Sequence, residues 1–234
     1  MTVFDNLSAI HERIALAARR VGRSPNDVAL MAVTKTFPPE TIRAAYEAGQ
    51  RLFGENRVQE FAKKVGALSE MHDAEFHMIG HLQSNKAAKA AEIFHALDSL
   101  DSVKLAERLN ASAQKLGKTL DVLIEINVGG EAAKSGIAPD SPELESILIA
   151  APEWKNLRIR GLMTVPPFTE DPEGARPYFR QLRELRDRLA ARSLPSVSLD
   201  VLSMGMSHDF EVAIEEGSTC VRLGTAIFGT RSKP

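Results

Sequence analysis

The sequence predicts an α/β protein with a (β/α)8 TIM barrel and an additional N-terminal helix, and three observations carry this prediction. Short stretches rich in Val, Ile, Leu and Phe alternate with helical stretches along all 234 residues. The eight strand candidates begin on average about 27 residues apart, which matches one strand–helix unit. Strands such as VALMAV and DVLIEINV are apolar on both faces, as in a parallel sheet covered by helices.

The additional helix comes first, over residues 4–21. Apolar side chains recur there every three or four positions, at Leu7, Ile10 and Ile14 for example, and Gly22 follows as a stop signal. Because this helix precedes the first strand candidate, we expect it to lie outside the eight repeated units.

The repeated units then follow in order. The strand candidates span residues 28–35, 51–56, 76–81, 95–100, 121–128, 158–166, 198–206 and 219–228. The helical stretches between them, most of which begin with Pro or Ser, span residues 38–49, 57–68, 84–94, 102–115, 141–150, 172–192 and 207–217. No GxGxxG motif follows the first strand, and the composition does not change along the chain. We therefore expect one domain over residues 1–234 rather than an open dinucleotide-binding sheet.

Composition and charge exclude several classes of protein. With 44% apolar residues, the chain can bury a full core, which excludes a disordered protein. Its formal net charge is only -2, so no overall field favours nucleic acid or a membrane surface. The longest apolar run covers residues 28–33, far short of the roughly 20 residues that span a bilayer. Lys63 and Lys64 lie near acidic residues in a helical stretch, so we expect them on a solvated face.

Two further residue types bear on the compartment and on metal binding. Cys220 is the single cysteine, which allows no internal disulfide and favours a cytoplasmic protein. Its apolar neighbours predict a buried small residue rather than a nucleophile. His77 and His81 are four residues apart, but they fall on a predicted strand instead of a helix, so we expect no metal site.

In a barrel of this class, binding residues lie at the carboxyl ends of the strands, and phosphate commonly binds after the seventh and eighth. Lys35 ends the first strand candidate, where a partly desolvated amine can attack an aldehyde; a lysine that simply reaches toward water is the alternative. Gly205 precedes Ser207, the expected N-cap of the next helix, and Gly224 precedes Thr225. These pairs predict N–H and hydroxyl donors for an anion, although both glycines could serve only tight turns.

Six segments that follow one another along the chain also carry a family resemblance. They are AVTKTFP at 32–38, FGENRVQE at 53–60, FHMIGHLQSNK at 76–86, KSGI at 134–137, RGLMTVPP at 160–167 and LSMGMSHDFEVAIEEGSTCVRLGTAIFG at 202–229. Together they resemble the pyridoxal-phosphate homeostasis protein family, also called the YggS/PROSC family. The resemblance implies a barrel like the N-terminal domain of alanine racemase, with pyridoxal 5′-phosphate (PLP) as its cofactor.

The resemblance also implies roles for individual residues. Lys35 would hold the cofactor aldehyde as a Schiff base, Arg222 would face the pyridine nitrogen, and Asn56 would lie beside the ring. Ser207, Gly224 and Thr225 would hold the phosphate, and His81 and Met204 would line the pocket. The full cofactor-binding set implied is Lys35, Asn56, His81, Met204, Ser207, Arg222, Gly224 and Thr225.

Arg222 bears on which chemistry such a cofactor can perform. A guanidinium only donates hydrogen bonds, so the pyridine nitrogen facing it must accept one and stay unprotonated. The ring then lacks the strong electron sink that a pyridinium supplies. The family resemblance agrees, because it implies a carrier or regulator in vitamin B6 homeostasis without catalytic turnover. Apo PLP-dependent enzymes would be its partners, and we expect a monomer.

Three other functions compete with this interpretation. An alanine-racemase-like racemase needs a second base, which that enzyme takes from an additional domain and a partner subunit. Here only Tyr46 and Tyr178 are available, both in predicted helices, and the chain ends six residues after Phe228, so we expect no such domain. A PLP-free Schiff-base lyase acting on a sugar phosphate could use Lys35 and the same anion site, and a pure interaction scaffold would use neither.

Overall fold

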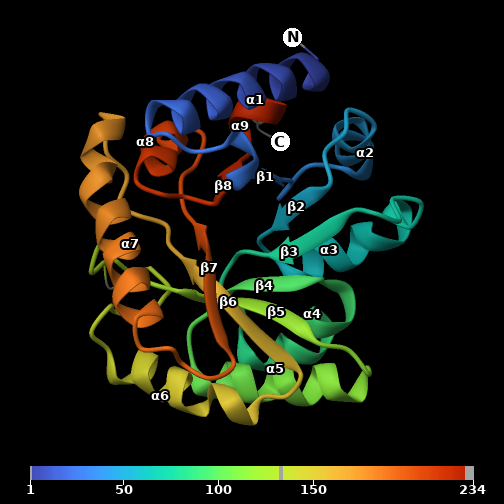
Figure 1. The fold of residues 1–234 in the computed structure, drawn as a ribbon. Helices are drawn as coiled ribbons and strands as arrows, with labels where there is room; N and C mark the ends of the chain where they lie inside the picture. The colour runs from blue at the N-terminus through green and yellow to red at the C-terminus, as the bar shows by residue number, and fades with distance from the viewer. Residues whose placement is uncertain (1, 132–133, 230–234) are drawn as a thin grey trace.

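The computed structural model describes residues 2–131 and 134–229, and it confirms the predicted barrel (Figure 1). Eight strands pair in chain order, every pair is parallel, and β1 pairs with β8 to close the cylinder. The strands are β1 (Ala29–Val33), β2 (Leu52–Glu55), β3 (Glu75–Met78), β4 (Ala96–Leu100), β5 (Leu120–Glu125), β6 (Leu157–Met163), β7 (Val197–Ser203) and β8 (Cys220–Leu223).

Helices surround the strands in chain order (Figure 1). They are α1 (Val3–Arg20), α2 (Pro39–Glu47), α3 (Val58–Lys64), α4 (Ala87–Ile93), α5 (Val103–Lys115), α6 (Pro142–Ala150), α7 (Arg176–Ala190), α8 (Phe210–Glu215) and α9 (Thr225–Phe228). Among the described residues, no helix is both long and apolar enough to cross a membrane.

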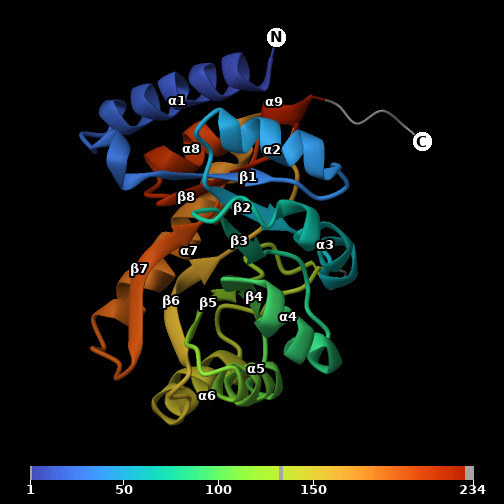
Figure 2. The same cartoon turned by 90° about the vertical axis from the view of Figure 1, so that its right-hand side faces the viewer.

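Helix α1 is the additional N-terminal element, and its bounds lie within one residue of the prediction. Thr2 and Asp5 form a capping box at its start, and Gly22 follows its end at φ +70°. Its apolar face is buried, and the helix packs on α8 and α9, as both views show (Figure 2). This extra helix therefore covers the part of the barrel formed by the last unit.

The predicted strands all exist; β4 ends at Leu100 as predicted, and the other seven end earlier than predicted. The largest difference follows β8, where Thr225–Phe228 forms the short helix α9 instead of continuing the strand to Phe228. Helix α8 begins at Phe210 with Asp209 as its N-cap, so the prediction that Ser207 caps this helix was wrong. The residues Thr225–Phe228 have the composition of a strand, which is why composition did not reveal the end of β8.

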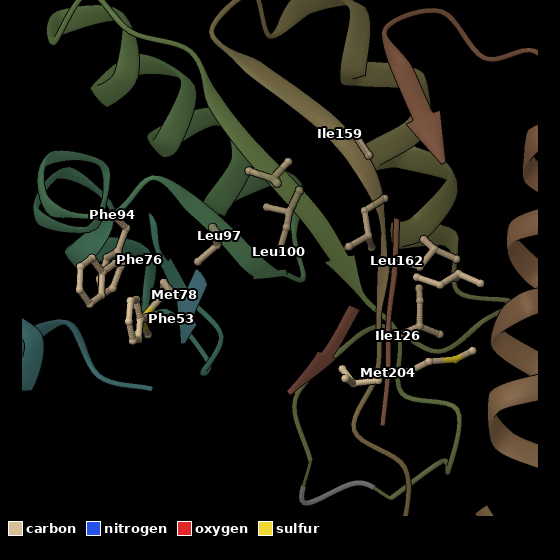
Figure 3. Close-up of a cluster of buried hydrophobic side chains, with 14 of the residues drawn as sticks. Phe53, Phe76, Met78, Phe94, Leu97, Leu100, Ile126, Ile159, Leu162 and Met204 are labelled. Atoms are coloured by element: carbon tan, nitrogen blue, oxygen red, sulfur yellow. The ribbon is translucent and has the colours of Figure 1, made fainter. Parts of the chain in front are cut away.

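The apolar core lies between the sheet and the helices. Phe61 of α3 contacts Phe76 of β3 and Phe94, with ring centroids 4.7 and 4.8 Å apart, and Phe53 stacks on Phe76 at 5.1 Å. Figure 3 shows three of these rings together with other members of the buried cluster. Met204 belongs to the same buried cluster (Figure 3).

Candidate functional site at the carboxyl ends of the strands

Parallel strands bring the predicted binding residues to one end of the barrel. Lys35 lies in the turn after β1, Asn56 follows β2, and Ser207 follows β7. Ala32 of β1 pairs with Leu223 of β8, so the turn that carries Lys35 is adjacent to the end of β8. The expected neighbourhood of residue 35 and the last two strands is therefore present.

The first turn of α9 offers hydrogen-bond donors beside this end of β8. The hydroxyl oxygen of Ser207 accepts from the N–H groups of Gly224 and Ala226, both at 3.3 Å. Thr225, the first residue of the helix, is exposed. The Ser207 hydroxyl, in the loop after β7, thus already accepts from the donors that an anion would use.

The two glycines of the sequence argument differ in their role. Gly205 has φ +96°, and a Cβ there would lie 2.6 Å from the Cβ of Ala213, so this glycine serves the tight turn into α8. Gly224 has φ -117°, and a Cβ there would meet Val33 at ordinary contact distances. Of these two glycines, Gly224 is the one whose N–H donates to the Ser207 hydroxyl.

Arg222 lies inside the barrel, 4% exposed. Its guanidinium donates to the hydroxyl of Ser203 and to the carbonyl of Thr164, each at 2.7 Å. Burial lowers the pKa of Arg222, and the carboxylates of Asp98 and Glu125 act in the opposite direction. An arginine stays protonated in proteins, so a fixed cationic donor stands below the mouth of the barrel.

Glu125, the last residue of β5, is a site candidate that the sequence analysis missed. Asp121 and Leu123 precede it at alternate positions and line the barrel interior, so its side chain faces inward. Its Oε1 accepts from the hydroxyl of Ser135 at 2.9 Å, whereas its buried Oε2 has no hydrogen-bond partner. Burial raises the pKa of this carboxyl. The alternation along DVLIEINV was the available signal.

The KSGI segment explains why Glu125 is enclosed. The N–H of Ile137 donates to the carbonyl of Glu125 at 2.8 Å, which ties the segment to the end of β5. Gly136 has φ +99°, and a Cβ there would lie 3.1 Å from Cγ of Glu125. The segment therefore needs glycine at this position to close over the carboxyl group.

Asn56 and His81 share a pocket of about 470 Å³ at the ends of β2 and β3. Gly80 lets the two segments approach, because a Cβ there would lie 2.4 Å from the carbonyl oxygen of Asn56. The ring of His81 is half exposed, and its Nδ1 lies 3.1 Å from a carboxylate oxygen of Asp101. This pair places a polar edge on the same end of the barrel.

Met204 and Cys220 stand apart from this polar group. Met204 is fully buried in the apolar cluster, while its neighbour Ser203 is the one that contacts Arg222. Cys220 is buried, and burial raises the pKa of its thiol to about 12. A thiol with that pKa is not a nucleophile at neutral pH, in agreement with its predicted role as a buried small residue.

The opposite end of the barrel interior contains a second cavity, of about 370 Å³. His77 lies there with its Nδ1 at 3.0 Å from Asp98, and Asp121 contacts Arg160 at 3.5 Å. The two histidines of the predicted third strand thus each face a different aspartate. They occur at opposite ends of the sheet region and do not form one site.

Comparison with known proteins adds the following findings. A family model described as the alanine racemase N-terminal domain matches residues 6–232. A pyridoxal phosphate homeostasis protein from Aquifex aeolicus is 48% identical over 231 residues, 99% of each chain. Another from Pseudomonas aeruginosa is 42% identical over 230 residues, which is 98% of this chain and 96% of that protein.

Solved structures of other proteins have the same fold as this chain. PipY of Synechococcus elongatus, with PLP bound, has a TM-score of 0.80 and 39% identity, covering 94% of this chain and all of that one. An alanine racemase from Clostridium difficile has a TM-score of 0.73 at 15% identity, covering 98% of this chain and 58% of the racemase. The second likeness concerns the fold alone.

Proposed function

The chain belongs to the alanine racemase N-terminal domain family and, within it, to the pyridoxal phosphate homeostasis proteins, and from this premise we propose that it binds PLP as a carrier or regulator of the cellular PLP supply. The relative PipY binds PLP on the same fold over its whole length. The residues at the carboxyl ends of the strands have the chemistry that this cofactor needs.

The phosphate of the cofactor would lie at the first turn of α9. The N–H groups of Gly224 and Ala226 point to one acceptor position, now held by the Ser207 hydroxyl at 3.3 Å. An entering phosphate would take these N–H bonds and accept another from the hydroxyl, as anions do at helix N-termini. This adjacency of an anion cradle to the Lys35 turn is the observation that carries the proposal.

Arg222 would orient the ring, and Lys35 would hold the aldehyde end. Ser203 and Thr164 fix the position of the guanidinium. Because a guanidinium has N–H donors and no acceptor, it would donate to the pyridine nitrogen. When bound, PLP supplies an electrophilic aldehyde carbon that a lysine amine can attack. Asn56 and His81 would line the open side through the pocket they share.

We propose further that the protein acts without catalytic turnover. An arginine opposite the ring nitrogen keeps that nitrogen unprotonated and weakens carbanion chemistry. Of the two tyrosines that could serve as a second base for racemisation, Tyr46 lies in α2 and contacts Asp73, and Tyr178 lies in α7. Both stand outside the barrel interior. Transfer of PLP to apo enzymes in the cytoplasm completes the proposal.

The test is covalent trapping of PLP on Lys35. Borohydride reduction of the loaded protein, followed by peptide mass spectrometry, is expected to find the adduct on this lysine. Lys35→Ala should lose the adduct and the yellow colour while keeping its thermal unfolding midpoint, and Lys89→Ala, in an exposed position of α4, should behave like the parent.

Other outcomes separate the competing functions. An adduct on a different lysine would contradict the assignment to Lys35. A parent protein that is colourless and takes up no PLP would favour the sugar-phosphate lyase. A Lys35→Ala protein as yellow as the parent would favour a role that does not depend on this lysine.

A further inference from the structure

The turn that carries Lys35 has an unusual backbone. It joins β1 to α2 over residues 34–37 and is closed by a hydrogen bond of 3.1 Å from the N–H of Phe37 to the carbonyl of Thr34. Thr36, next to Lys35, has φ +69°. A β-branched residue at positive φ is strained, so contacts from outside the turn must hold this conformation.

Lys64, the last residue of α3, supplies such contacts. The sequence placed it on a solvated face, but its side chain is only 9% exposed. Its Nζ lies 3.2 Å from the carbonyl oxygens of both Thr34 and Phe37, one on each side of Lys35. The ammonium group therefore bridges the two ends of the turn.

Two glutamates complete this cluster, which we define as Glu55, Glu60 and Lys64. The ammonium of Lys64 also donates to Glu55 at 2.8 Å and to Glu60 at 3.3 Å. Both carboxylates in turn contact the same turn. Glu55 accepts from the hydroxyl of Thr34 at 2.8 Å, and Glu60 accepts from the N–H of Thr36.

Burying the charged groups of this cluster carries a large desolvation penalty, so the burial needs a functional explanation. Desolvating a charged pair often cancels its attraction, and apolar side chains of similar volume would stabilise the fold as well or better. The three hydrogens of the Lys64 ammonium are shared among four acceptors, and two of these are carbonyls of the Lys35 turn. The second carboxylate oxygen of Glu55 is buried without any hydrogen-bond partner. The contacts of this cluster hold the Lys35 turn in one conformation.

We infer that Lys64 is a positioning residue that, with Glu55 and Glu60, fixes the turn so that the amine of Lys35 is presented to the aldehyde of an incoming ligand. The inference rests on the proposed function. In that step the nitrogen of Lys35 bonds to the aldehyde carbon, the carbonyl oxygen leaves as water with two hydrogens from the amine, and nothing is oxidised or reduced. A fixed approach direction speeds such a reaction without changing how the ligand's far end binds.

The experiment separates reaction rate from ligand affinity. Apo protein is mixed with PLP, and the growth of the covalent adduct is followed by absorbance and by borohydride trapping. Affinity for pyridoxamine 5′-phosphate, which has the ring and phosphate but no aldehyde, is titrated in parallel. For Lys64→Met we expect adduct formation at least tenfold slower, with the affinity for pyridoxamine 5′-phosphate within twofold of the parent. The matched control is Lys63→Met, at an exposed position one residue away, which should equal the parent in both measurements.

A second variant removes the effect of stability. Lys64→Met alone leaves the Glu55 carboxylate buried without its cation, whereas Glu55→Gln combined with Lys64→Met removes both charges and should regain the thermal midpoint. We expect the double variant to remain slow, since the carbonyls of the turn still lack their donor. Recovery of the parental rate in the double variant, or an unchanged rate in Lys64→Met, would overturn the positioning role. A parent that takes up no PLP would instead overturn the proposed function, and the positioning role with it.

Discussion

The two ends of the barrel interior contain the same kinds of side chain but leave different hydrogen bonds unmade. At the amino end of the strands, Asp98 is paired with His77 at 3.0 Å. Asp121 there contacts Arg158 at 2.5 Å and Arg160 at 3.5 Å. These carboxylates are matched by cations from the chain itself.

At the carboxyl end the balance is different. Arg222 contacts a hydroxyl and a carbonyl oxygen, and Glu125 has a buried oxygen without a hydrogen-bond partner. Among the described residues, the other buried side-chain oxygen without a hydrogen-bond partner belongs to Glu55, which faces α3 and is paired with Lys64. Native proteins rarely leave such atoms unpaired, so the unused hydrogen-bonding capacity of Glu125 and Arg222 supports the proposal that the cofactor binds at the carboxyl end.

The largest expected effect compares one arginine at each end. Arg222→Met removes two hydrogen bonds of a buried cation, so we expect each lost bond to cost about 1–3 kcal/mol in the free energy of unfolding, together with a loss of PLP binding. Arg160→Met, whose side chain is 39% exposed, should cost less than about 1 kcal/mol and leave binding unchanged. Urea unfolding and PLP titration measure both, and equal effects at the two ends would break the comparison.

The next effect belongs to the amino end and concerns pH. Burial opposes a charged ring at His77, but Asp98 and Glu75 more than offset it and raise its pKa from 6.5 to about 9. The folded state thus holds this proton more tightly than the unfolded state. Its stabilisation is fully present below pH 6.5 and is lost as the pH rises through 9.

The shift corresponds to about 3 kcal/mol at 1.36 kcal/mol per unit. Urea unfolding between pH 6 and pH 9.5 should show this loss in the parent and not in His77→Gln. PLP affinity should be the same for both proteins at each pH, because the pair lies at the other end. A parallel pH profile in the variant would rule out His77 as the source.

The sequence predicted the barrel and its strands more completely than the contacts at the ends of the strands. Eight apolar strands at regular spacing identify a barrel because each strand must bury both faces, and this property is visible in composition. Lys64 shows what composition hides. Val58, Phe61 and Lys64 share one buried face of α3, at helical spacing, yet its charge and its neighbour Lys63 suggested a solvated position. The carbonyl oxygens that accept from the buried ammonium belong to the Lys35 turn, in another strand–helix unit, and no local pattern around Lys64 indicates them.

The carboxyl end of β8 could not be predicted from the sequence for a related reason. The segment after β8 has the β-branched and aromatic residues of a strand, but Gly224 and the acceptor from Ser207 begin a helix there. The two hydrogen bonds to the Ser207 hydroxyl join residues that are 17 and 19 positions apart, so no local sequence pattern predicts them. The resemblance placed Ser207 and Gly224 in one cofactor-binding set, and the fold gives the reason that the two residues meet.

A smaller effect tests the anion cradle. Ser207→Asp places a carboxylate where the phosphate would accept hydrogen bonds, so PLP affinity should fall at least about tenfold, or 1.4 kcal/mol. Ser198→Asp puts the same side chain at the opposite end of β7, where the parental hydroxyl contacts Asp200, and should leave the affinity unchanged. Fluorescence titration with PLP distinguishes the two, and unchanged affinity in Ser207→Asp would place the phosphate elsewhere.

The smallest effect comes from the unpartnered oxygen at the carboxyl end. Glu125→Gln keeps an oxygen that can accept from Ser135, so PLP affinity should fall only about two- to fivefold, the value of one hydrogen bond of about 0.5–1 kcal/mol. Because burial raises the pKa of Glu125, ionising it weakens the fold, and the parent should lose stability as the pH rises above 4.5 through the folded pKa while the variant does not. Glu75→Gln, exposed at the amino end, is the control and should leave PLP affinity unchanged. If Glu125→Gln binds PLP like the parent at every pH, its free oxygen has no part in binding, and unmade hydrogen bonds would no longer distinguish the two ends.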